Sequence, residues 1–233
     1  MKRFYKEVSV GADGDGHRIL LDGRPVHSPA RRPLVLPDAA LALAVAAEWR
    51  GQGETIEQAG MALTRLASTA VDRMPALRGA AIAELADYAL TDLLCYRAAA
   101  PADLAERQRQ SWQPWLDWLA RTHGAMLVVT TAMLPVTQPE PAVLRLRQVI
   151  ERLDDWCLVG LHAATTALGS VVLGLALLEG EIDAEQAFAA SLLDEFYEIE
   201  RWGMEREAQR RHDALRRDLK AVARFAACLR QAG

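Results

Sequence analysis

The run from Leu158 to Leu178 contains no charged side chain, and this feature constrains the fold more than any other. A stretch of this length is long enough to span a bilayer or to form a buried helix in a helical protein. Asp154 and Asp155 precede the run, and no basic anchors flank it, which argues against a membrane span. We therefore expect a buried central helix that is broken at Gly169, and no stable membrane insertion.

The N-terminal part of the chain carries strand and turn signals. Residues 4–10 alternate between polar and apolar side chains, as in a half-buried strand. Residues 11–16 are rich in glycine and aspartate, which predicts a loop. Asp22 and Gly23 form the dipeptide most typical of a tight hairpin turn. The sequence therefore predicts a small antiparallel sheet.

Helical patterns dominate the rest of the chain. Asp38 predicts the N-cap of a helix over residues 39–50. We expect an α+β fold, with a small N-terminal antiparallel β domain and one packed helix at 1–60, followed by a larger all-helical orthogonal-bundle domain at 61–233. The predicted helices of the second domain are 62–73, 76–98, 102–122, 140–157, 158–179, 184–202 and 204–230.

Composition excludes several classes of protein. The net charge of -4 argues against a nucleic-acid-binding surface, which needs a concentrated basic face. The three cysteines, Cys95, Cys157 and Cys228, are far apart and form no C-x-x-C pair, so we expect neither a metal site nor a disulfide framework. The first residues lack an apolar leader. We expect a protein of the bacterial cytoplasm that is monomeric when free.

Enzyme motifs are absent from the sequence. The chain has no G-x-S-x-G elbow, no H-E-x-x-H pair and no G-x-x-x-x-G-K-[ST] phosphate loop. His162 stands alone in an apolar stretch, where a histidine is usually a hydrogen-bonded core residue. We therefore expect no catalysis and no cofactor.

An acidic edge, defined by Asp194, Glu195, Glu198, Trp202 and Glu205, follows one side of the predicted helix 184–202 and its continuation. Like charges four residues apart destabilise a helix, so helix formation alone does not favour this arrangement. One interpretation is a solvated helix edge. The other is a surface that binds a basic partner, in which case reversing one charge weakens binding and leaves folding almost unchanged.

Five further residues suggest structural roles. We expect Trp49 and Trp112 to be largely buried, Trp49 as the anchor of an alanine-rich helix. Trp112 begins a tryptophan-rich helical stretch that favours a core layer, with a partner surface as the alternative. Arg65, Thr69 and Asp72 share one polar helix face and predict a short hydrogen-bonded network.

Several short motifs occur in a fixed order along the chain. They are Arg3-Phe4-Tyr5, Leu21-Asp-Gly-Arg-Pro25, Ala47-Glu-Trp49 with Gln52, Leu63-Thr-Arg-Leu66 with Thr69 and Asp72, Tyr88, Thr91-Asp-Leu-Leu94, Tyr96-Arg-Ala98, Trp112, Pro114, Trp118, Gly169-Ser170, Leu175-Ala-Leu177, Asp194-Glu195, Glu200 and Trp202-Gly203. Together they resemble the ATP synthase assembly chaperones that attend the alpha subunit of the soluble catalytic head, known from mitochondria and some bacteria.

The resemblance covers nearly the whole chain, and it implies a chaperone without enzymatic activity. Its partner would be the unassembled alpha subunit, held until beta subunits replace the chaperone, and the acidic edge would receive basic groups of that subunit. Three positions depart from the family pattern. Ala62 stands where proline is usual, Glu198 where glutamine is usual, and Glu205 where aspartate is usual.

A helical enzyme or small-molecule-binding protein is the alternative class. Its site would lie between the two domains, with Asp194, Glu198 and Arg65 as candidate polar groups. Turnover, or a ligand that raises thermal stability, would favour this class, and stoichiometric capture of a subunit would favour the chaperone.

Overall fold

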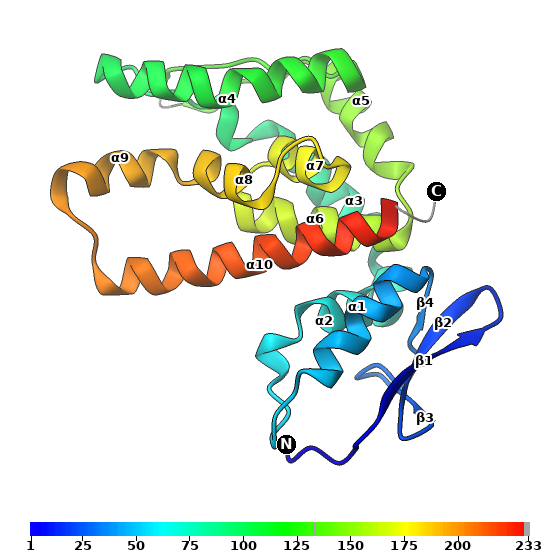
Figure 1. Cartoon of the computed structure of the whole chain (residues 1–233). Coiled ribbons are helices and arrows are strands. Elements are labelled where there is room, and N and C mark those ends of the chain that lie inside the picture. The colour runs from blue at the N-terminus through cyan, green and yellow to red at the C-terminus, as the bar shows by residue number, and fades with distance from the viewer. Residues whose placement is uncertain (133, 231–233) are drawn as a thin grey trace.

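The computed structural model describes residues 1–132 and 134–230, and it has the α+β architecture that the sequence predicts. Its N-terminal unit is a four-stranded antiparallel sheet of β1 (Val8–Asp13), β2 (Gly16–Leu21), β3 (Arg24–Pro25) and β4 (Val35–Leu36). Strand β2 is central, because it pairs with each of the other three strands. The unit lies at the lower right in Figure 1.

Two tight turns set the register of the sheet. The turn at Asp22 is confirmed: Asp22 has a φ of 48°, and Leu21 pairs with Arg24 across it. The Asp22 carboxylate also accepts hydrogen bonds from the backbone nitrogens of Lys6 (3.0 Å) and Glu7 (2.8 Å). The loop predicted at residues 11–16 is wrong, because β1 continues to Asp13 and the chain turns only at residues 14 and 15.

Helix α1 (Ala39–Arg50) packs on the sheet, and one of its side chains caps the N-terminus of the next helix. As predicted, Asp38 caps α1 through its side chain. Near the other end of α1, the Glu48 carboxylate accepts hydrogen bonds from the backbone nitrogens of Leu63 (2.8 Å) and Thr64 (2.8 Å) and from the Thr64 hydroxyl (2.7 Å). Glu48 thus supplies the N-terminal cap of α2 (Ala62–Asp72), for which the preceding Met61 offers no side-chain acceptor.

The helical part begins with α2 and differs from the predicted helices at three points. The predicted helix 76–98 ends at Asp87 and gives way to short 3-10 turns, 140–157 ends at Glu151, and 184–202 divides at Leu192. The observed helices are α3 (Met74–Asp87), α4 (Ala102–His123), α5 (Glu140–Glu151), α6 (Asp155–Leu168), α7 (Val171–Glu179), α8 (Ala184–Ser191), α9 (Leu193–Trp202) and α10 (Arg206–Arg230).

The uncharged run forms α6 and α7, which pack against each other in the centre of the helical part. The break at Gly169 is confirmed: Gly169 has a φ of 66°, a left-handed conformation that glycine adopts without strain. Ser170 caps α7, and the buried Asp92 carboxylate accepts hydrogen bonds from the Ser170 hydroxyl (2.8 Å) and the Val172 nitrogen (3.2 Å). No helix among the described residues is both long and apolar enough to cross a membrane.

The apolar core of the N-terminal unit extends beyond residue 60. It is completed by Met61, Leu63 and Ala67 around α2 and by Phe225 and Cys228 of α10. A second core fills the space among the helices of the helical part, and it includes Ala70 of α2 and Leu219 and Val222 of α10. The division of the chain into domains 1–60 and 61–233 remains a prediction, because the two cores share helices α2 and α10.

Candidate partner-binding surface

The acidic edge lies on α9 and on the turn that joins α9 to α10. Helices α9 and α10 form an antiparallel pair that extends to the left in Figure 1, with α4 above it and the sheet at the opposite side of the molecule. Gly203 ends α9 with a φ of 85° and turns the chain toward α10. The edge therefore lies at the far end of a helical arm.

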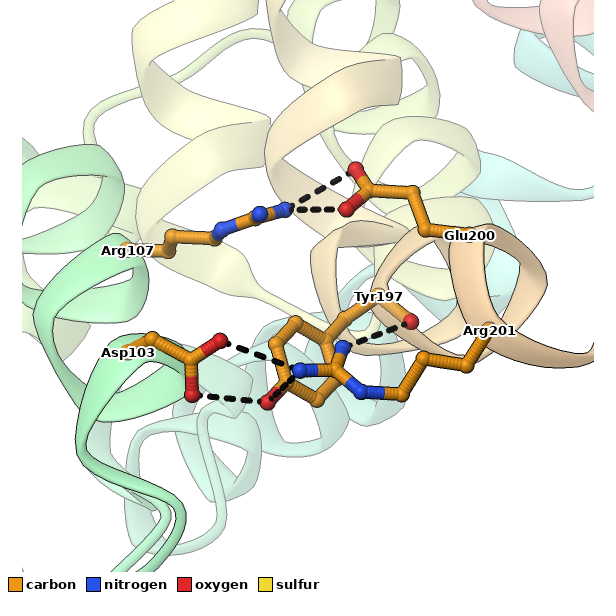
Figure 2. Close-up of polar contacts among 5 residues, drawn as sticks. All are labelled: Asp103, Arg107, Tyr197, Glu200 and Arg201. Atoms are coloured by element: carbon orange, nitrogen blue, oxygen red, sulfur yellow. Dashed lines mark hydrogen bonds and ion pairs between the residues drawn. The ribbon is translucent and has the colours of Figure 1, made fainter.

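A polar cluster fastens α9 to α4 (Figure 2). The Arg201 guanidinium stacks 3.4 Å from the centre of the Tyr197 ring, and the Arg107 guanidinium lies 5.4 Å from the same centre. Asp103 accepts hydrogen bonds from the Tyr197 hydroxyl (2.8 Å) and from Arg201 (3.0 Å), and Arg107 bonds both oxygens of Glu200 (2.9 and 2.8 Å).

Two guanidinium groups of this cluster lie against the Tyr197 ring. Tyr197 is only 2% exposed, although most residues around it on α9 are exposed or half-buried. The hydrogen bond from Tyr197 is the main cause that lowers the pKa of Asp103 below its ordinary value. The charges of Asp103 and Arg201 thus offset each other, and α9 is held in one position relative to α4.

Asp194 and Glu195 also hold α9 in place. Asp194 accepts a hydrogen bond from Gln108 of α4 (2.7 Å). Glu195 accepts a hydrogen bond from Arg211 and lies 2.8 Å from Nε2 of His212, which is 2% exposed. Both carboxylates therefore have partners within the chain. The expectation that reversing Glu195 leaves folding almost unchanged is accordingly replaced by the expectation of a loss of stability.

Glu198, Trp202 and Glu205 are the part of the acidic edge that remains available to a partner. All three side chains are exposed, and the carboxylates of Glu198 and Glu205 make no ion pair with the described residues. Trp202 is 81% exposed, and Met204 beside it is 41% exposed. We call Glu198, Trp202, Met204 and Glu205 the tip surface. It combines two negative charges with a tryptophan, the residue type most enriched among interface hot spots.

Comparison with known proteins identifies the family. A family model described as the ATP12 chaperone protein matches residues 2–120, about half of the chain. The crystal structure of Atp12 from Paracoccus denitrificans is 39% identical, with a TM-score of 0.93 and 97% of each chain covered. This chain belongs to the ATP12 chaperone family. The family resemblance inferred from the sequence is confirmed.

Two further relatives extend the ATP12 comparison. The Atu1473 protein from Agrobacterium tumefaciens is 36% identical, with a TM-score of 0.94, over 98% of this chain and 86% of that chain. A mitochondrial protein of Schizosaccharomyces pombe, named atp12, is 25% identical over 231 residues, which are 94% of this chain and 78% of the relative. The two structural matches cover at least 97% of this chain, so the chain shares its overall architecture with both solved structures.

Trp49 and Trp112, the two tryptophans expected to be largely buried, differ in their burial. Trp112 is fully buried, and its indole nitrogen donates to the backbone oxygen of Ala190 (2.8 Å), which ties α4 to α8. Trp49 is half-buried, less than expected. Its backbone oxygen accepts a hydrogen bond from the Tyr5 hydroxyl (2.6 Å), and the two rings meet edge to face, so the N-terminal segment packs on the end of α1.

The predicted network of Arg65, Thr69 and Asp72 is wrong in its partners. The Thr69 hydroxyl donates to the backbone oxygen of Arg65 (3.0 Å), and the Arg65 guanidinium lies 3.6 Å from Asp218 of α10. Asp72 turns toward the loop after β3, where it accepts hydrogen bonds from the Ser28 hydroxyl and the Ala30 nitrogen. The three side chains share a helix but bind three different partners.

The site proposed for a helical enzyme is not assembled in the structure. Arg65 lines pockets beside α2, whereas Asp194 and Glu198 lie on α9 and line none of those pockets. Within the described ranges, no group of three or more histidine, cysteine or acidic side chains could hold a metal ion. The three candidate polar groups of this alternative are therefore not brought together in one site.

Sequence reasoning missed the residues that position the tip surface. Tyr197, Asp103, Arg107 and Arg201 were not singled out from the sequence. The sequence does contain a signal: Tyr197, Glu200 and Arg201 are spaced i, i+3 and i+4, so an aromatic ring and two charged groups share one helix face. Their partners lie about a hundred residues earlier, and one sequence alone does not reveal them.

Proposed function

We propose that this chain is an ATP synthase assembly chaperone that binds the unassembled alpha subunit of the catalytic head and prevents its aggregation. The observation that carries the proposal is membership of the ATP12 family over nearly the whole chain, together with the ordered motifs quoted above. Binding by mass action suffices for such a holder, because a partner that binds only the folded subunit stabilises it without turnover.

The tip surface is the part of the chaperone that we propose to contact the alpha subunit. A subunit that lacks its neighbours exposes apolar surface, and Trp202 offers a large, rigid side chain to fill a recess in it. Glu198 and Glu205 place negative charge beside that anchor, which suits basic groups on the subunit and speeds association. The polar cluster around Tyr197 fastens the helix that carries most of this surface to α4.

The first test mixes the purified protein with isolated alpha or beta subunits of ATP synthase and measures the products by size-exclusion chromatography and light scattering. We expect a complex with alpha that suppresses its aggregation, no complex with beta, and no need for nucleotide hydrolysis. Equal protection of unrelated unfolded proteins would contradict selectivity for alpha.

The second test locates the surface. Trp202→Ala and the double change Glu198→Lys with Glu205→Lys should each weaken binding of alpha by about 2–5 kcal/mol. Glu181→Lys is the matched control, because Glu181 is an exposed acid in the turn between α7 and α8. Binding should also weaken as salt rises, since charges are screened over about 8 Å at physiological ionic strength. Unchanged affinity for both tip variants would show that the tip surface is only a solvated helix edge.

A further inference from the structure

A pocket of about 570 Å³ lies beside α2, and none of the tip-surface residues lines it. Its floor includes the apolar or aromatic side chains of Pro29, Trp49 and Met61, and its long wall is one face of α2. That wall contains Thr64, Arg65, Ser68, Thr69 and Asp72, and Arg73 continues it. The volume lies within the usual range of ligand pockets.

The motif residues that the proposed function does not use gather at this pocket. Trp49, Arg65, Thr69 and Asp72 were expected to act within the fold, and all four line the pocket. Only Asp72 has a clear structural partner in the loop opposite. Arg65 has a single ion-pair partner among the described residues, Asp218, at 3.6 Å with both side chains more than half exposed. An exposed pair at this distance contributes little to stability.

The walls of the pocket are held in place by hydrogen bonds. Asp72 binds the Ser28 hydroxyl and the Ala30 nitrogen, and Arg32 donates to the backbone oxygen of Val71 (3.0 Å). These bonds fix the loop of residues 28–32 against α2. On the other side, Glu48 holds the start of α2. A pocket that exists before its ligand arrives loses less conformational entropy on binding.

The charge that remains in the pocket is positive. Asp72 is the only carboxylate among the lining residues, and its two oxygens are occupied by the loop. Arg65 and Arg73 supply two guanidinium groups among the lining residues, and Arg65 also lies 3.6 Å from Asp218, which is not a lining residue. A planar guanidinium next to an apolar floor suits a carboxylate that is attached to an apolar segment.

The shape of the pocket favours a segment of protein chain. The lining residues extend along α2 from Met61 to Arg73, which is about 18 Å at the helical rise of 1.5 Å per residue. An extended chain rises about 3.3 Å per residue, so roughly five residues would fill this length.

We propose that this pocket binds a short extended segment of a partner protein in which a carboxylate lies next to an apolar side chain. The carboxylate pairs with Arg65 and Arg73, and the apolar side chain rests on Trp49 and Met61. The chaperone would then hold its partner at two places of opposite charge, basic groups at the tip surface and acidic groups at α2. The proposal takes from the proposed function only that the ligand is a protein.

The experiment uses the peptide acetyl-Ala-Leu-Glu-Leu-Ala-amide and its matched control with glutamine in place of glutamate. The 15N-labelled full chain is titrated with each peptide, and the indole signal of Trp49 and the backbone signals of Ser68 and Thr69 are followed by NMR. The Trp49 signal is assigned with Trp49→Phe. No ATP synthase subunit is present, so the result is independent of which client the chaperone serves.

We expect the acidic peptide to shift these signals and the glutamine peptide to bind about tenfold more weakly, as the loss of one charged hydrogen bond implies. Arg65→Gln should cause a similar loss, whereas Arg152→Gln, an exposed arginine at the end of α5, should leave binding unchanged. Ser68→Trp should block the pocket. If Arg65→Gln does not fold, Arg73→Gln tests the same charge.

Three outcomes would overturn the proposal. Equal binding of the two peptides would show that Arg65 and Arg73 do not bind the carboxylate. Shifts confined to other parts of the chain would place the binding elsewhere. Inorganic phosphate or acetate that shifts the same signals as strongly as the acidic peptide, at the same concentration, would show a general anion site.

Discussion

Replacing Glu48 by alanine should lower the stability of the whole protein, because this side chain of α1 caps α2. Its two oxygens accept three hydrogen bonds, from the backbone nitrogens of Leu63 and Thr64 and from the Thr64 hydroxyl, at 2.7 to 2.8 Å. The carboxylate also lies at the positive end of the α2 dipole. Leu63 is buried, so in the alanine variant water can accept hydrogen bonds from only some of the three donors.

The magnitude follows from these three bonds. Loss of an ordinary N-cap costs about 0.5–2 kcal/mol, and a hydrogen bond to a charged group contributes about 1.5–3 kcal/mol. Since the three bonds share one carboxylate and Glu48 is half-buried, we expect a loss of about 2–4 kcal/mol for Glu48→Ala. For a chain of this size, each kcal/mol lowers the melting temperature by about 2–4 °C.

The assay is thermal and urea denaturation of Glu48→Ala, with Glu48→Gln and Glu57→Ala beside it. Glu48→Gln keeps one acceptor oxygen and should lose less stability than Glu48→Ala. Glu57 is an exposed acid just before α2, and its loss should cost less than about 0.5 kcal/mol. If Glu48→Ala and Glu57→Ala melt at the same temperature, the cap contributes nothing and the reasoning is refuted.

Four further tests concern the fold and its charges. Trp112→Ala should cost about 3–5 kcal/mol in urea denaturation, and Trp49→Ala clearly less because Trp49 is half-buried; an equal loss would contradict this difference. Glu195→Lys should lower the melting temperature while Glu198→Lys does not, because Glu195 hydrogen-bonds the buried His212 and Glu198 is exposed. Gly174→Ala should destabilise the pair of α6 and α7, since its new methyl group would lie 2.6 Å from the Thr165 hydroxyl; a variant as stable as wild type would show that Thr165 moves aside without cost. Burial raises the pKa of Asp92 from 3.8 to about 6, so the folded chain binds the Asp92 proton more tightly than the unfolded chain, and the stability gained from this protonation is lost as the pH rises through about 6. The melting temperature of wild type minus that of Asp92→Asn should therefore grow as the pH falls from about 7 to about 5. A constant difference would argue against this titration.

Features that depend on neighbouring residues were predictable from the sequence. The uncharged run and Gly169 determine α6 and α7, because a chain in water has to bury such a run and glycine readily ends a helix. Asp22 and the Asp38 cap followed from equally local chemistry. The division at Leu192 did not, since no glycine or proline marks it, and Leu192 accepts a φ of -106° in the tertiary structure.

Features that depend on distant partners were not predictable. Glu48 caps a helix fifteen residues further on, and Tyr197 is buried by arginines from two helices. The acidic edge shows the same limit. Its charges were grouped by spacing along one helix, but α4 and α10 supply partners to Asp194 and Glu195 and leave Glu198 and Glu205 exposed.

The attachment of α9 has a consequence for how the arm moves. Only Tyr197 of α9 is fully buried, and most of the bonds that hold this helix join charged groups at the surface. Helix α7 is instead buried along almost its whole length. Local opening of α9 thus requires little exposure of apolar surface, whereas opening of α7 approaches global unfolding. Amide hydrogens of α9 should exchange with solvent much faster than those of α7, and faster still at high salt. Helix α9 can therefore open and re-form locally while the centre of the molecule stays closed.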